Sequence, residues 1–197
     1  YILSLFNQSI QEEIEAWRRE NPQDYIRLLN DISVYATMQK RWYLLTFLEG
    51  INVKVLGEVQ GELKEGQEAI PVESYEEYLS AIGRSYITIL SFPYNVPSGI
   101  GFSPLEVAYM GSAPFIDYRM TLPGFLSPGQ ECITYMPLDR ADIEEKLLYY
   151  LENLEEAKEI GATAREKVLQ RYTYQDRGDF LLDLFHQIVE QAQKESQ

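Results

Sequence analysis

The first fifty residues place apolar side chains at every third or fourth position, the period of an amphipathic helix. This spacing predicts an acidic helix over residues 1–20 and a second helix over residues 23–48. Pro22 lies between them, where it suits the first turn of the second helix. Gly50 is expected to cap that helix. A strand at residues 32–35 is the weaker alternative for part of it.

From residue 51 the period shortens, and β-rich runs alternate with helical segments. A capping box at Ser74 and Glu77 predicts a helix that ends near Arg84. A short helix is expected at 103–110. The continuous apolar run 86–92 is typical of a strand buried on both faces. In all, we expect five strands, at residues 51–57, 69–72, 86–92, 113–116 and 132–136. The rest of the chain predicts three helices, at residues 139–154, 155–171 and 173–193.

Strands that alternate with helices indicate parallel βαβ units with right-handed crossovers. The predicted fold class is therefore α/β: a Rossmann-like parallel sheet of about five strands flanked by helices, with an N-terminal helical extension. Residues 1–22 are predicted to be this extension or a linker, and residues 23–197 the Rossmann-like domain. Ligands of such sheets bind beyond the carboxyl ends of the strands, so the loops that follow the strands are the candidate sites.

Composition excludes several classes of function. The 197 residues carry 17 Lys and Arg against 31 Asp and Glu, a net charge of −14. This acidity argues against nucleic acid and anionic lipid as partners. A single cysteine, Cys132, excludes an intrachain disulfide framework, and a single histidine, His186, excludes a histidine-rich metal site. Core packing is the expected role of Cys132, and a surface or packing position that of His186.

The chain shows no signal peptide, no membrane-spanning segment and no initiator methionine. The default expectation is a cytoplasmic protein, and the sequence is a candidate piece of a longer chain.

Residues 95–114 are the most informative segment, because a strand ends there and a glycine-rich turn opens a helix. Gly99 and Gly101 would let a ligand approach the backbone. With Ser103 as the expected N-cap, free N–H groups of the turn could bind phosphate oxygens. Glu106 in the first helical turn could accept hydrogen bonds from two vicinal sugar hydroxyls. The alternative is structural: such loops precede many helices, and an early glutamate stabilises the helix dipole.

Residues 101–114, GFSPLEVAYMGSAP, resemble the donor-site signature of GT-B glycosyltransferases, roughly Gly-Phe-x-x-x-Glu-Ala-x-Ala-x-Gly-x-Pro. The surrounding sequence resembles the glycosyltransferase group 1-like branch that includes the spore-maturation (CgeB-like) proteins. The resemblance extends over residues 24–184. The segments that carry it are, in order, Arg41, 50–57, Tyr75-Glu-Glu-Tyr78, 89–95, 122–131 and 172–177.

The resemblance implies the C-terminal, donor-binding half of a two-domain glycosyltransferase, which binds a nucleotide-diphosphate sugar and transfers the sugar to an unknown glycan, protein or small-molecule acceptor. By the same resemblance Glu106 holds the donor ribose, and the turn formed by Gly99, Gly101, Phe102 and Ser103 faces the diphosphate. Transfer is expected to need no metal and no cofactor besides the donor. The acceptor site and any catalytic base belong to an N-terminal Rossmann-like half, so this chain alone is expected to be inactive.

Two positions depart from the family pattern. Ser98 stands where the superfamily signature has a second glutamate, and Ser103 stands where the branch has an arginine. Arg119, the one basic residue among residues 85–138, could replace the missing phosphate contact. Equally, it could pair with Asp117 or Glu131.

Further positive charge for the phosphates would have to come from Lys40, Arg41 or a missing domain. The departures support an alternative function, a non-catalytic Rossmann-like interaction module with a decayed donor site. A flavodoxin- or receiver-like module is disfavoured, because the strand ends lack an acidic cluster.

Overall fold

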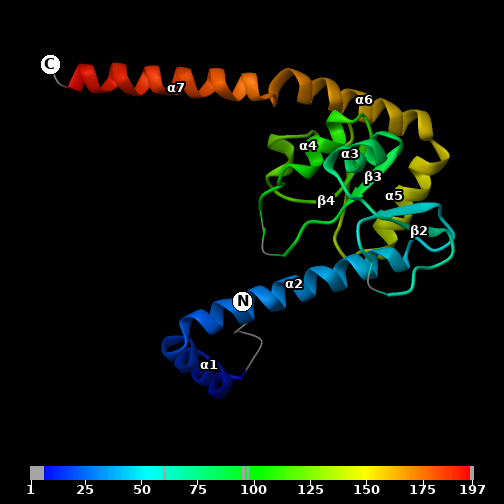
Figure 1. Ribbon diagram of the computed structural model, residues 1–197, viewed down its shortest axis with the longest axis horizontal. Helices are drawn as coiled ribbons and strands as arrows, with labels where there is room; N and C mark the ends of the chain where they lie inside the picture. Colours follow the sequence, from blue (N-terminus) through cyan, green and yellow to red (C-terminus); the bar gives the residue numbers. More distant parts are fainter. Residues whose placement is uncertain (1–6, 60, 95, 97, 196–197) are drawn as a thin grey trace.

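The structure is a computed structural model that describes residues 7–59, 61–94, 96 and 98–195. It alternates helices and short strands, as expected for an α/β protein (Figure 1). The helices are α1 (Gln8–Glu20), α2 (Pro22–Thr46), α3 (Tyr75–Gly83), α4 (Ser103–Tyr109), α5 (Arg140–Glu152), α6 (Leu154–Arg171), α7 (Tyr174–Glu195) and a 3₁₀ turn, η2 (Leu122–Gly124). The strands are β1 (Val53–Leu56), β2 (Gln67–Ile70), β3 (Ile87–Leu90), β4 (Ala113–Asp117) and β5 (Ile133–Tyr135).

The five strands are all parallel, but they form two sheets where one was expected. β1 pairs with β2, and β3, β4 and β5 form a separate sheet in that order. β1 reaches the core through the side chain of Val53, while its backbone bonds to β2. Leu44 near the end of α2, and Phe47 and Leu48 directly after the helix, pack into the same cluster beside Ile87 of β3. β1 and β3 are thus connected by packing of apolar side chains, and not by backbone hydrogen bonds between the two strands.

β4 is the central strand of the larger sheet, and all five of its residues are buried. Phe115 stacks on Tyr135 of β5 with 5.1 Å between ring centroids. The prediction that 86–92 is buried on both faces is wrong, because β3 lies at an edge of this sheet and its residues are half-buried. Cys132 is buried, as expected, in a cluster with Phe92.

α6 crosses the turn that joins α4 to β4 at very short range. A Cβ atom on Gly161 would lie 2.3 Å from the carbonyl oxygen of Gly111, so only glycine fits there. The neighbouring Ala157 and Ala164 are fully buried on the same side of α6. Small side chains at this spacing let the helix lie directly on the turn and on β4.

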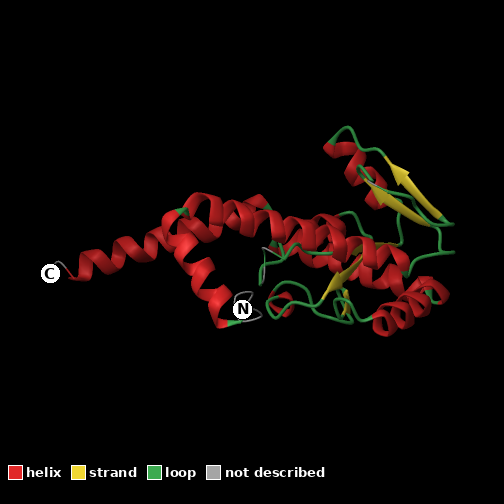
Figure 2. Cartoon of the chain, turned by 90° about the horizontal axis from the view of Figure 1, so that it is seen from below, coloured by secondary structure: helices red, strands yellow, loops and turns green. Residues whose placement is uncertain are grey.

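α7 and the first part of α2 extend away from the strands (Figures 1 and 2). His186 on α7 is exposed, as are many apolar side chains of both helices. Within the described residues, no helix combines the length and apolar character needed to cross a bilayer.

Element boundaries differ from expectation by a few residues. α2 is continuous through residues 32–35, so the alternative strand is wrong. Its C-cap is Phe47, and Gly50 follows in a turn with φ of 79°. The second strand runs over 67–70, earlier than the expected 69–72. Residues 1–6 of the expected first helix lie outside the described part of the chain. The division at residue 22 stays a prediction.

Candidate functional site

Glu106 lies in the first turn of α4, half-buried, at the carboxyl-end side of β3. The helix begins at Ser103, one residue earlier than a cap at that serine would require. Its N-cap is Phe102, and no side chain caps it, so the prediction of Ser103 as the N-cap is wrong. Pro104 falls in the first turn, where its missing N–H costs no hydrogen bond.

Two tyrosines from α3 face this carboxylate. The Tyr75 hydroxyl donates to Glu106 Oε1 at 2.8 Å. Tyr78, one turn further along α3, lies near enough to the Glu106 carboxylate for that charge to raise the pKa of its phenol. The two rings are stacked, with centroids 6.0 Å apart and an interplanar angle of 26°. A carboxylate with two phenols in reach is a polar site at the surface, half shielded from water.

Glu106 raises the pKa of both phenols. The hydrogen bond to Glu106 is the main cause of a raised pKa at Tyr75. At Tyr78 burial raises the pKa first, and the negative charge of Glu106 adds to it. Both phenols therefore stay protonated at neutral pH and can donate. From the sequence, Tyr75 and Tyr78 were named only within a segment that carries the resemblance, and no site role was predicted for them. The available signal was the spacing i, i+3 at the start of a capped helix.

The glycine-rich turn leads directly into α4. Ile100 is buried in the cluster of Phe92, while its neighbours Gly99 and Gly101 are exposed. Gly101 has a φ of 60°, in the left-handed region that disfavours other residues. Phe102 is 81% exposed. The turn is thus anchored by one apolar side chain and exposes backbone on either side of it.

Arg119 is bound to protein groups. Its Nη1 donates to the Val96 carbonyl at 2.6 Å, and its Nη2 lies 3.4 Å from Asp117 Oδ2. The guanidinium also lies over the Phe92 ring, 5.3 Å from its centroid. Of the two alternatives, the structure contains the pairing with Asp117. Glu131 pairs instead with Lys167. A phosphate contact of Arg119 stays a prediction.

Lys40 forms a second ion pair with the same carboxylate. Its ammonium lies 2.9 Å from Asp117 Oδ2 and donates to the Phe92 carbonyl, and the Phe92 N–H donates to Asp117 Oδ1 at 3.0 Å. Burial lowers the pKa of Lys40, and Asp117 opposes that shift only in part. Arg41 donates to the Ser91 carbonyl at 3.4 Å.

Side chains from other elements therefore hold the start of the glycine-rich loop by its carbonyl groups.

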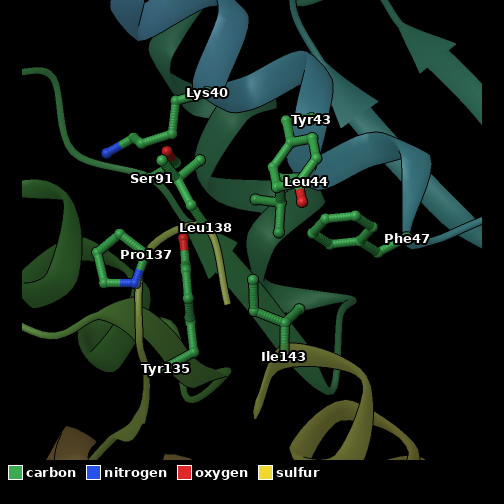
Figure 3. Close-up of a pocket in the computed structure, with 9 residues that line it drawn as sticks. All are labelled: Lys40, Tyr43, Leu44, Phe47, Ser91, Tyr135, Pro137, Leu138 and Ile143. Atoms are coloured by element: carbon green, nitrogen blue, oxygen red, sulfur yellow. The ribbon is translucent and has the colours of Figure 1, made fainter. Parts of the chain in front are cut away.

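Beside Lys40 a small cavity of about 10 Å³ lies between α2, β5 and the loop that follows β5 (Figure 3). At that volume it admits about one water molecule, so it cannot hold a nucleotide. Glu106 and the exposed glycines are not among the residues that line this cavity.

A family model described as glycosyl transferase-like matches residues 39–183. The chain belongs to this glycosyl transferase-like family. The match includes Glu106, the glycine-rich turn, Arg119 and Lys40, and excludes α1, the first part of α2 and the end of α7. The more specific resemblance to the CgeB-like branch stays a prediction.

A relative in Aquifex aeolicus (strain VF5), an uncharacterized protein, is 46% identical over 192 residues. The alignment covers 97% of this chain and 48% of the relative, so the chain spans about half the length of the relative that it matches.

Two solved structures have a similar fold. TarM aligns with a TM-score of 0.58 at 15% identity, over 77% of this chain and 32% of its own. The sucrose-phosphate synthase of Thermosynechococcus elongatus aligns with a TM-score of 0.58 at 14% identity, over 75% of this chain and 42% of its own. Both have the GT-B fold. The predicted α/β class and its likeness to GT-B proteins are confirmed for this glycosyl transferase-like chain.

Proposed function

We propose that this chain binds the nucleotide-diphosphate sugar donor of a glycosyl transfer reaction, and that Glu106 accepts hydrogen bonds from the 2′- and 3′-hydroxyls of its ribose. One observation carries the proposal: in a glycosyl transferase-like chain, Glu106 is half-buried beside an exposed glycine-rich turn. An ionised carboxylate has about four lone-pair sites. The bond from Tyr75 to Oε1 therefore leaves room for two sugar hydroxyls.

The diphosphate would follow the backbone from Gly99 to Ser103. Backbone N–H groups bind phosphate oxygens without adding formal charge. They suit residues 85–138, which contain one basic and three acidic residues and so offer little positive charge for a diphosphate. Gly101, in the left-handed region with open space around its Cα, would let the phosphates come close. Phe102 and Ser103 complete this turn. The sugar donor is then a substrate, and no separate cofactor is proposed.

The acceptor and the catalytic base are proposed to belong to another domain, because the chain spans about half the length of its relative. On this proposal the isolated chain binds the donor but does not turn it over.

A second candidate function is a non-catalytic module whose donor site has decayed. Ser98 and Ser103 favour it, since the family pattern has charged residues at both positions. The engagement of Lys40 and Arg119 with Asp117 also favours it, because this buried carboxylate competes with a phosphate for both cations.

Thermal unfolding in the presence of UDP-, GDP- and ADP-sugars, which all carry the complete ribose diol, tests the proposal. A ligand at a hundredfold excess over its Kd stabilises the folded state by about 2.7 kcal/mol. We expect one of these donors to raise the Tm of the wild-type chain, and Glu106→Ala to remove the increase. Glu159→Ala, which deletes an exposed carboxylate of α6, is the matched control and should keep it.

Absence of any shift in the wild-type chain would contradict donor binding and support the non-catalytic module. A shift that persists in Glu106→Ala would place the ligand elsewhere on the chain.

A further inference from the structure

Tyr75 makes a contact that its packing does not require. The side chain is 60% exposed, so its hydroxyl could bond to water at little cost, yet it donates to Glu106 Oε1 at 2.8 Å. The acceptor is an ionised carboxylate, which makes the hydrogen bond stronger than one between neutral groups. A surface tyrosine bound in this way restricts the rotation of the carboxyl group that it contacts.

The start of α3 is built to hold Tyr75 in place. The Ser74 hydroxyl accepts from the Glu77 N–H at 3.2 Å, and the Glu77 carboxylate accepts from the Glu73 N–H at 2.9 Å. These two bonds satisfy donors at the start of the helix and fix its first turn. At the other end Ile82 is 1% exposed and anchors α3 in the core. Tyr75, the first residue of α3, therefore projects from a fixed helix end.

Tyr78 supports the same arrangement from one turn further along α3. Its ring stacks on that of Tyr75, and its hydroxyl lies near both Glu106 and Ser103. Tyr75 and Tyr78 thus reach the start of α4 together. The hydrogen bond from Tyr75 limits the positions that the Glu106 side chain can take, and the Tyr78 ring supports that of Tyr75.

We propose that Tyr75 is a positioning residue for the ligand, because its hydroxyl fixes the Glu106 carboxylate in the orientation that accepts a ribose diol. This inference rests on the proposed function. A free glutamate side chain loses rotamer entropy when a ligand immobilises it, whereas a carboxylate already held by a phenol has lost much of it before binding. Tyr75 would then contribute to affinity without touching the nucleotide base or the phosphates.

The test compares ribonucleotides with deoxyribonucleotides, because only the former carry the complete diol. Isothermal titration measures the Kd of ADP, GDP and UDP, and of their 2′-deoxy counterparts, for wild type and Tyr75→Phe. The substitution keeps the ring and its stacking and removes one oxygen. The control is Tyr149→Phe, because Tyr149 donates to Glu156 at the same 2.8 Å, far from this site in the sequence.

In wild type we expect one base to bind, with the ribonucleotide preferred about tenfold, the value of roughly one net hydrogen bond. In Tyr75→Phe the preference should fall to about threefold or less, through a weaker ribonucleotide Kd. Tyr149→Phe should keep the wild-type preference. An unchanged preference in Tyr75→Phe overturns this inference alone, and absence of nucleotide binding in wild type overturns the proposed function with it.

A second measurement does not depend on nucleotides. In the chain labelled with ¹³C-tyrosine, NMR titration follows the Tyr75 phenol, which the Tyr75→Phe spectrum assigns. The bond to Glu106 raises the pKa of Tyr75, so Glu106→Gln should lower it toward its ordinary value. An unaltered Tyr75 titration in Glu106→Gln would show that the contact is absent and overturn the inference even where nucleotides bind.

Discussion

The consecutive helices α6 and α7 have similar sequence patterns, but only α6 buries its apolar side. Both repeat apolar residues at helical spacing, and each contains one glycine. α6 buries the side that carries Ala157, Ile160 and Gly161. Ala157 and Ile160 belong to the hydrophobic cluster that also contains residues of β4. On α7 the described apolar side chains remain about half exposed: Phe180, Leu181, Leu182, Leu184, Phe185, Ile188 and Val189.

The difference shows what periodicity determines and what it leaves open. A period of 3.6 residues specifies a helix and the direction of its apolar side. Whether that side is buried depends on the surface opposite it. α6 meets the Gly111 turn, and Gly161 allows contact with the backbone itself. α7 extends past the sheet and meets no comparable surface in the described part of the chain (Figure 2).

The same substitution in each helix should separate them most clearly. Ile160 is 4% exposed and Ile188 is 54% exposed. Removing a buried isoleucine side chain leaves a cavity, so Ile160→Ala should destabilise the chain by about 2–5 kcal/mol. Ile188→Ala should change stability by less than about 0.5 kcal/mol. Urea unfolding followed by circular dichroism measures both. Equal losses would show that α7 is packed as tightly as α6.

Glycine-to-alanine substitutions should give changes of opposite sign. In Gly161→Ala the new methyl group would lie 2.3 Å from the Gly111 carbonyl oxygen, which belongs to the backbone and cannot rotate away. We expect a loss of about 1–3 kcal/mol from overpacking. Gly178 is exposed, and a Cβ atom added there would meet nothing within 4 Å, so Gly178→Ala should gain up to about 1 kcal/mol of helix propensity.

The readout is again the urea midpoint, with the m-value checked for a two-state transition. Stabilisation by Gly161→Ala would mean that α6 does not lie against the turn. A loss in Gly178→Ala would mean that α7 is not a regular helix at that position.

Local features of the sequence predicted much of this fold. The capping box at Ser74 and the helices after residue 139 lie within a few residues of their expected places, because caps and periodicity act over one or two turns. The division of the strands into two sheets was not predicted, because it depends on whether β1 joins β3 by its backbone or by the side chain of Val53. That choice is made by contacts between distant parts of the chain.

The candidate site divides in the same way. Glu106 and the glycine-rich turn were found because they adjoin in sequence. The contacts around them were not: Tyr75 is 31 residues from Glu106, and Lys40 is 77 residues from Asp117. Neither pair has a spacing that a helix or a strand would produce. Contacts of this kind depend on how the strands and helices are arranged in space. The sequence pattern predicted only the α/β fold class and not that arrangement.

A smaller difference between the helices lies in the carboxylate that forms hydrogen bonds or ion pairs with each of them. The Glu131 carboxylate binds Lys167 of α6 at 2.5 Å and the Ser127 N–H at 2.6 Å. Burial alone would raise the pKa of Glu131, but these bonds outweigh it and hold the pKa below its ordinary value of 4.5. At the start of α7, hydrogen bonds from Thr173 likewise lower the pKa of the half-buried Asp176.

A carboxyl group whose pKa is lowered by folding stabilises the folded state fully above its unfolded pKa. That contribution is lost as the pH falls through the lower, folded value. Stability should therefore decrease below about pH 4.5, and Glu131→Gln should remove part of that decrease, about 1 kcal/mol. Asp176→Asn should remove less, because Asp176 is bound by the neutral N–H and hydroxyl of Thr173, whereas Glu131 also binds the Lys167 ammonium. Urea midpoints between pH 3 and 6 measure this, and a larger effect at Asp176 would mean that the start of α7 is held more firmly than α6.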